Sequence, residues 1–140
     1  MKLAREEGAQ AIAEFALMLP LILLIVTGLF DLARAVWQEN TLAFATREAS
    51  RYAIVHGSAS TAPAGPPPLS DQAIQDTVFR YSVGLTNVTV TTAWPDGNND
   101  RNSRVSVDAT APFVPIASAY LLGGAFQITL RGGSMLVIQR

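Results

Sequence analysis

The fold is decided by the stretch Glu14-Phe15-Ala16-Leu17-Met18-Leu19-Pro20-Leu21-Ile22-Leu23-Leu24-Ile25-Val26-Thr27-Gly28-Leu29-Phe30, in which one carboxylate precedes an apolar run that ends at Asp31. Counted back to Ala9, the segment has about 22 residues, which lets a helix span a bilayer core of about 30 Å. The span reaches this length only if Glu14 lies inside it. The sequence therefore predicts a membrane or filament-core segment at residues 9–30 that contains an ionisable group.

Glu14 is expected to have a partner or a task, because a carboxylate at membrane depth costs on the order of 2.5 to 3.5 kcal/mol on insertion scales. One interpretation is an ordinary anchor whose Glu14 side chain snorkels to the headgroups. The other is a helix that leaves the bilayer for a protein polymer, where Glu14 meets a cationic group of a neighbouring chain. Small residues on one helix face, Ala9, Ala13 and Ala16, permit close helix packing in either setting.

The composition excludes several classes of function. The chain has 140 residues, 49% of them hydrophobic and 15% charged, so one small domain plus an apolar segment leaves few side chains for a polar active site. The net charge of -1, without a basic cluster, argues against a nucleic-acid partner. One His and no Cys leave zinc sites, thiol catalysis and disulfides without ligands. We expect neither an enzyme nor a bound metal or cofactor.

Helical character continues beyond the apolar run. Apolar residues such as Leu42, Ala45 and Ala49 recur at spacings of three and four, so residues 10–56 are predicted to form one long helix. Pro20 removes a backbone hydrogen bond, and a kink or local unwinding is expected there. Residues 57–69 form a linker rich in Pro, Ser and Ala that is not expected to make a packed element.

Residues 70–140 are predicted to form a globular, β-rich head. A helix is expected from Asp71 to about Val83, and alternating residues predict a hairpin around a turn at 95–100. A short helical turn at 116–122, further alternation at 126–130 and a strand or strand continuation at 135–138 complete the chain. The predicted fold class is α+β, with a long N-terminal hydrophobic helix followed by a small antiparallel β-sheet and one or two short helices.

The turn of this hairpin places oxygen ligands at alternate positions, Asp96, Asn98 and Asp100, as the first part of a calcium loop does. Arg101 stands where that motif has Gly, and no bidentate Glu follows at the required distance. A solvated hairpin turn is therefore favoured over a calcium site.

Several motifs together resemble the type IV pilin superfamily, and more closely the TadE-like proteins of tight-adherence (Flp) pilus systems. They are a charged leader at residues 1–9, Gln10-Ala11-Ile12-Ala13-Glu14-Phe15, Leu19-Pro20 and Asp31-Leu32-Ala33-Arg34-Ala35. The blocks Ala45-Thr46-Arg47-Glu48-Ala49-Ser50-Arg51-Tyr52-Ala53 and Ala111-Pro112-Phe113-Val114-Pro115 are also similar to that family. The resemblance covers the first half of the chain closely and the head loosely.

The resemblance implies a single-pass protein of the cytoplasmic membrane, with its N-terminus inside, that enters an extracellular filament. Its implied partners are copies of itself, the pilus assembly platform and a prepilin peptidase. In such pilins the Glu is the fifth mature residue, so processing would cut between Ala9 and Gln10 instead of directly after Gly8. Cleavage and retention of the leader both stay open.

Assembly is expected to depend on Glu14, Phe15, Pro20, Ile22 and Gly28. The partner of Glu14 would be the free amine of a neighbouring processed chain or, if the leader is retained, a leader cation such as Arg5 of an adjacent subunit. The first functional hypothesis is a structural pilin-like subunit that polymerises through its hydrophobic helix. The alternative is a membrane-anchored minor pilin or pilus-assembly accessory protein that stays in the cytoplasmic membrane.

Overall fold

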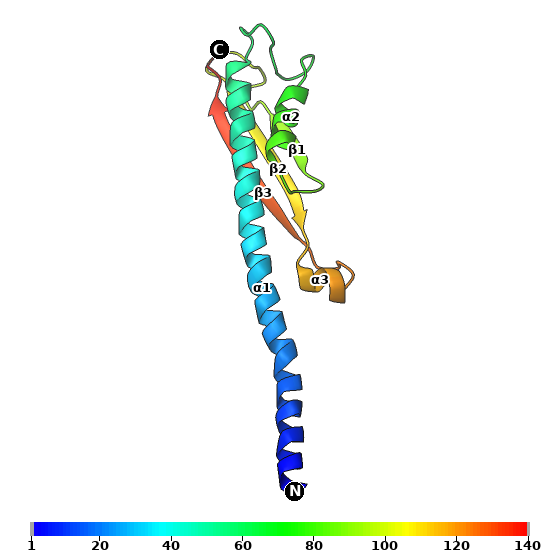
Figure 1. Cartoon of the computed structure of the whole chain (residues 1–140). Coiled ribbons are helices and arrows are strands. Elements are labelled where there is room, and N and C mark those ends of the chain that lie inside the picture. The colour runs from blue at the N-terminus through cyan, green and yellow to red at the C-terminus, as the bar shows by residue number, and fades with distance from the viewer. Residues whose placement is uncertain (1, 140) are drawn as a thin grey trace. The chain divides into compact units, whose positions relative to one another are not determined.

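The computed structural model describes the backbone of residues 2–139 and the side chains of residues 10–120 and 122–139. Its elements are α1 (Lys2–Val55), α2 (Gln72–Tyr81), β1 (Thr89–Ala93), β2 (Arg104–Phe113), α3 (Ile116–Leu121) and β3 (Ile128–Val137) (Figure 1). A long N-terminal helix is thus followed by a small antiparallel sheet and short helices. The predicted α+β fold class is confirmed.

Helix α1 is continuous, with Pro20 inside it. The backbone stays α-helical on both sides of Pro20, so of the two predicted alternatives the local unwinding was wrong, and the kink stays a prediction. Proline removes one N–H donor from the helix, but the leucine-rich turns around it consist of good helix formers. The loss of one hydrogen bond therefore does not end the helix.

The chain divides into two compact units, and α1 contributes to both. The first unit contains α1 up to Arg34 together with Val114–Phe126, which includes α3. The second contains Ala35–Phe113 and the chain from Gln127 onward, and so holds the rest of α1, helix α2 and the sheet.

The sheet of the second unit has the strand order β1-β2-β3, and both pairings are antiparallel. The β1–β2 register pairs Thr92 with Val107, which confirms the predicted hairpin. Strand β3 runs without interruption through Gly132, which pairs with Ala109 of β2. The two apolar stretches near the C-terminus are therefore one strand, as the continuation alternative predicted.

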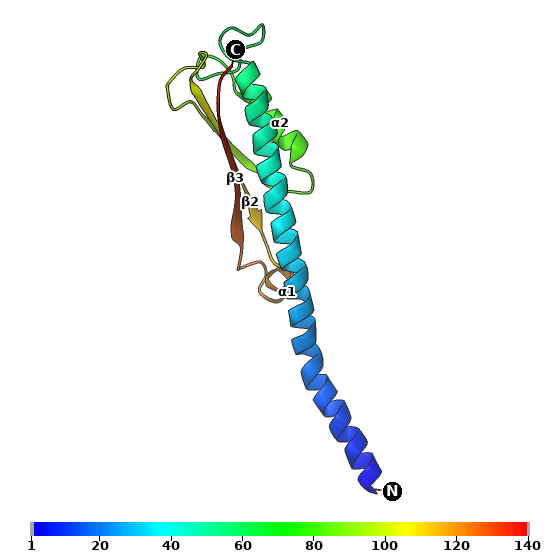
Figure 2. The same ribbon diagram turned by 90° about the vertical axis from the view of Figure 1, so that its left-hand side faces the viewer.

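The core of the second unit lies between this sheet and two helices. In Figure 2, α1 and α2 cover the same face of the sheet. The core consists of buried residues from α1, the 57–69 segment, α2, β2, β3 and the end of the chain: Leu42, Ala45, Ala49, Ala53, Ala64, Ile74, Val78, Val105, Val107, Ala109, Ala111, Phe113, Leu130 and Ile138. The second half of α1 is therefore a layer of the head rather than a stalk before it.

Gly132 lets α1 approach the sheet closely. A Cβ added at Gly132 would lie 2.7 Å from the backbone N of Ala43 and 2.7 Å from the carbonyl carbon of Leu42. Nearby, the Ser50 hydroxyl donates a hydrogen bond to the Ser134 carbonyl at 3.3 Å. Strand β3 and α1 are thus in direct backbone contact at the glycine.

The segment at residues 57–69 is not a free linker. Ala64 is buried in the core, and its N–H donates to the His56 carbonyl at 2.8 Å. The Asn99 side chain donates to the Ala64 carbonyl at 3.2 Å, and the Ser58 N–H donates to the Asn99 carbonyl at 2.9 Å. These contacts hold the segment against the hairpin turn. Its Pro and Gly residues prevent a regular helix or strand.

Candidate assembly site on the N-terminal helix

The first part of α1 presents a largely exposed apolar surface, which α3 borders only at its C-terminal end, from Pro20 to Thr27. Every residue from Gln10 to Val26 is exposed, including Phe15 and Ile22, two of the predicted assembly residues. An 18-residue window of this helix is long and apolar enough to cross a membrane by length and composition. Large apolar side chains that are exposed over several turns indicate a surface that contacts a bilayer or neighbouring helices.

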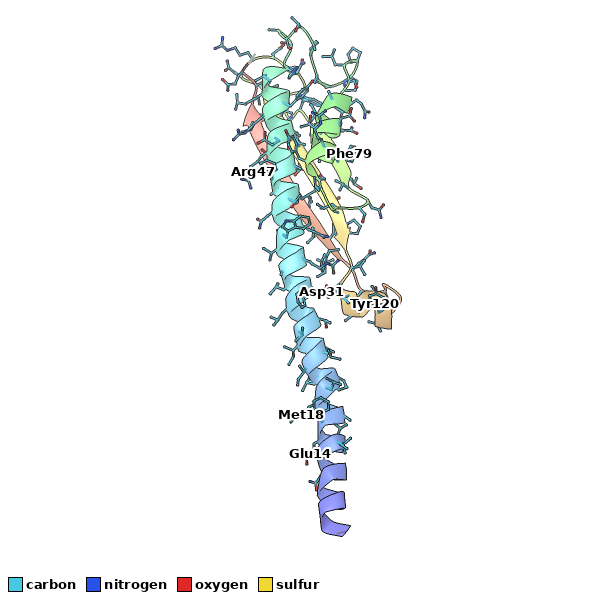
Figure 3. The ribbon with its side chains drawn as sticks, viewed as in Figure 1. Glu14, Met18, Asp31, Arg47, Phe79 and Tyr120 are labelled. Carbon is cyan, nitrogen blue, oxygen red and sulfur yellow. The ribbon has the colours of Figure 1, made fainter. Side chains whose placement is uncertain are left out.

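Glu14 lies within this surface (Figure 3). Its Oε1 atom accepts a hydrogen bond at 3.0 Å from the Nε2 of Gln10, one turn earlier. Among residues whose side chains are described, no ion pair involves Glu14. The amide dipole of Gln10 orients the carboxylate but does not neutralise its charge. The side chains of Arg5 and Ala9, and the surroundings of Gly8, lie outside the described residues.

Pro20 and Gly28 occupy different surroundings on this helix. A Cβ added at Gly28 would meet nothing within 4 Å, so this glycine leaves room for an atom from outside the chain. Pro20 lines a cleft of about 370 Å³ between α1 and α3. A role of Pro20 and Gly28 in assembly stays a prediction.

Asp31 has a role that sequence reasoning missed. It is 8% exposed, and its Oδ1 accepts a hydrogen bond from Arg34 Nη1 at 2.7 Å. Its Oδ2 accepts the N–H of Ile116, the first residue of α3, at 2.7 Å. The N-cap of α3 is Pro115, which makes no side-chain cap, so Asp31 supplies from α1 the acceptor that a capping side chain would provide.

The spacing Asp31-x-x-Arg34 makes the two side chains neighbours on a helix, which explains the ion pair. Nothing in the sequence indicated the contact with Ile116, which lies 85 residues further along the chain. Figure 3 shows Asp31 on α1 and Tyr120 on α3. The carboxylate fixes the start of α3 to α1 at the end of the apolar run.

Two of the three candidate calcium ligands at the hairpin turn, Asp96 and Asn98, bind protein groups. The Asp96 carboxylate forms an ion pair with Arg104 Nη2 at 2.7 Å and accepts the Arg104 backbone N–H at 2.8 Å. The side-chain hydrogen bond from Arg104 lowers the pKa of Asp96 to about 2. Asn98 Oδ1 accepts the Asp100 N–H at 3.0 Å.

Among the described residues, no group of three or more His, Cys, Asp and Glu side chains could hold a metal ion. A cation at the turn would have to displace Arg104 from Asp96. The contacts are those of a hairpin turn closed by its own side chains.

The chain thus combines an apolar helix of membrane-spanning length with a small sheet and short helices. Residues 8–51 match the family model described as TadE-like protein. The predicted resemblance is confirmed over this segment, which contains Glu14, the apolar run and the Asp31–Arg34 pair. Over this segment the match suggests a pilin-like protein associated with a Tad pilus. Neither the curated proteins nor the solved structures gave a match.

Proposed function

We propose that this chain is a structural subunit of a Tad-type pilus that polymerises by packing residues 10–30 of α1 against the same segment of neighbouring copies. The head formed by the second unit stays folded before and after assembly. Before assembly the apolar segment resides in the cytoplasmic membrane. The proposal is carried by one observation: Glu14, on an otherwise apolar and exposed helix surface, forms no ion pair with any side chain that the structure describes.

The charge of Glu14 supports assembly with other chains. An unpaired carboxylate in an apolar setting costs several kcal/mol or takes up a proton, and a neutral amide partner offsets only part of that cost. A cation from a neighbouring copy would remove the penalty in the filament but not in the isolated chain. The cation is the N-terminal amine of a processed neighbour or Arg5 of an unprocessed one. This ion pair would then fix the axial position of a new subunit relative to its neighbours in the filament.

The apolar side chains around Glu14 supply the driving force. Burial of each large apolar side chain stabilises the assembly by roughly 1.5 to 3 kcal/mol relative to water. The bilayer provides a similarly apolar environment, so the gain on leaving it is small. Transfer from membrane to filament therefore needs an external assembly machine, in keeping with the Tad pilus context.

The second candidate is a minor pilin or assembly accessory that stays in the membrane. It is favoured by the length of the apolar run, which matches a bilayer core when Glu14 is included. The two candidates differ in where the mature protein is found. Mechanically sheared surface filaments contain the first, whereas only the membrane fraction contains the second.

Glu14→Leu tests the proposal, with Glu39→Gln as the matched control on an exposed part of the same helix. Quantitative blots compare each variant in the membrane fraction and in sheared filaments. We expect Glu14→Leu to accumulate in the membrane and to be depleted from filaments, while Glu39→Gln behaves as wild type. A wild-type filament yield from Glu14→Leu would contradict the proposal and restore the snorkelling anchor.

A further inference from the structure

The segment Val114–Phe126, which packs with the anchor helix, carries no charge. No Asp, Glu, Lys, Arg or His occurs between Asp108 and Arg131. The segment contains α3 and joins α1 within the first compact unit. A surface loop of a soluble head normally carries charged residues, so this composition indicates an apolar environment.

The contacts of α3 place it on the membrane side of Asp31. The cleft between the two helices is lined by four residues of α1 between Pro20 and Thr27 and by Ile116, Ala117 and Tyr120 of α3. At 1.5 Å per residue, Leu24 lies about 10 Å from Asp31 along the axis of α1. Helix α3 therefore runs beside residues that belong to the membrane-depth segment 9–30.

Several polar groups of this segment form hydrogen bonds within the first unit. Ser118, which is buried, donates its hydroxyl to the Phe126 carbonyl at 2.7 Å and accepts the Phe126 N–H at 2.9 Å. Its carbonyl accepts the Gly124 N–H at 2.8 Å. Asp31 accepts the N–H of Ile116. Such closure is required of a non-helical turn in a bilayer, where an unsatisfied backbone group costs several kcal/mol.

The side chains that face outward are apolar or aromatic. Tyr120 is 86% exposed, Leu122 62% and Phe126 56%. Tyrosine is enriched at the headgroup level of membranes, where its ring meets lipid and its hydroxyl meets water. The pattern resembles an interfacial element with its polar groups turned inward.

We propose that Val114–Phe126 inserts into the membrane leaflet on the head's side, so that lipid acyl chains fill the cleft and surround Tyr120, Leu122 and Phe126. The chain then contacts the bilayer through two elements, the α1 anchor and the α3 segment, which Asp31 joins. Lipid is favoured over a protein partner because this surface continues the exposed apolar face of α1 and offers no charged group for specific pairing. The inference rests on anchoring by residues 10–30 and not on filament formation.

Site-directed spin labelling of the full chain in phosphatidylcholine vesicles tests this proposal. The natural sequence has no cysteine, so Tyr120→Cys and Leu122→Cys each give one nitroxide at an exposed position. Ile25→Cys, exposed on α1, is the membrane control, and Ala59→Cys, exposed in the segment after α1, is the water control. Collisions of the label with oxygen report lipid, and collisions with a water-soluble nickel chelate report solvent.

We expect the labels at 120 and 122 to resemble the label at 25 more closely than the label at 59. Their ratio of oxygen to nickel collisions should be severalfold higher than the ratio at 59. Labels at 120 and 122 that match the label at 59 would overturn the proposal. Low accessibility to both reagents would also overturn it, because that result indicates burial against protein, such as a second copy. Filament yield of Glu14→Leu is independent of either result, so failure here leaves the proposed function standing.

Discussion

Leu42→Ala tests whether the second half of α1 belongs to the core of the head. Leu42 is fully buried, with 0% of its surface exposed. Alanine has a helix propensity at least as high as that of leucine, so the substitution removes packing without weakening the helix. Any loss of stability then reports the contact between α1 and the sheet.

The expected loss is about 3 to 5 kcal/mol, the upper part of the range for a buried leucine. The cavity cannot close by moving α1 toward the sheet, because the helix backbone at Leu42 already meets β3 at Gly132. A unit of this size has a free energy of unfolding of roughly 5 to 14 kcal/mol. One side chain from α1 therefore accounts for a large share of the head's stability.

Urea unfolding of the full chain in detergent micelles measures this loss. Trp37 and Trp94 both lie in the second unit, so their fluorescence follows the unfolding of the head. Val36→Ala, 51% exposed on the same helix, is the matched control and should change the free energy of unfolding by no more than about 0.5 kcal/mol. A loss below about 1 kcal/mol for Leu42→Ala would refute the reasoning and favour a head that folds without α1.

Three further outcomes are expected. Gly132→Ala should lower the urea midpoint of the head more than Gly133→Ala does. A Cβ at Gly132 meets the α1 backbone, whereas one at Gly133 meets the movable Asp108 carboxylate at 2.6 Å. The hydrogen bond from the Thr92 hydroxyl lowers the pKa of Asp71 in the folded protein. Asp71 therefore stabilises the fold above its unfolded pKa of about 3.9, and this contribution is lost as the pH falls through the lower folded pKa. Urea midpoints of wild type and Asp71→Asn should thus differ at pH 7 and converge in acid, and an equal difference at both would contradict this assignment. Ile22→Asp should abolish filaments in the shearing assay while leaving the tryptophan unfolding curve of the head unchanged.

The elements with a strong local pattern could be predicted from the sequence. The apolar run defined α1, alternation defined β1 and β2, and the turn-rich stretch between them defined the hairpin. Helix α2 begins within one residue of the expected start, where the Ser70 hydroxyl accepts the Gln72 N–H at 3.1 Å. These features depend on neighbours in the chain, which a sequence displays directly.

Features that depend on distant neighbours could not be predicted. Composition predicted a loose linker at 57–69, but Ala64 packs in the core because α1 and the hairpin turn leave room for a methyl group. The spacing of Leu42, Ala45 and Ala49 indicated a buried face of α1 but not the sheet that buries it, because periodicity does not identify the neighbouring element. At the candidate site, Glu14 could be identified from the sequence because it is a charged residue next to an apolar run. The hydrogen bond from the Ile116 N–H to Asp31 depends on tertiary structure alone.

The central claim is that residues 10–30 of α1 leave the membrane to form the core of a filament. Electron microscopy of sheared surface filaments, with antibody labelling of the head and N-terminal sequencing of the subunit, tests it most directly. The account predicts label along the length of the filaments and a subunit whose N-terminal sequence belongs to this chain, beginning at Met1 or at Gln10. Unlabelled filaments, with all of the protein recovered in the membrane fraction, would contradict it.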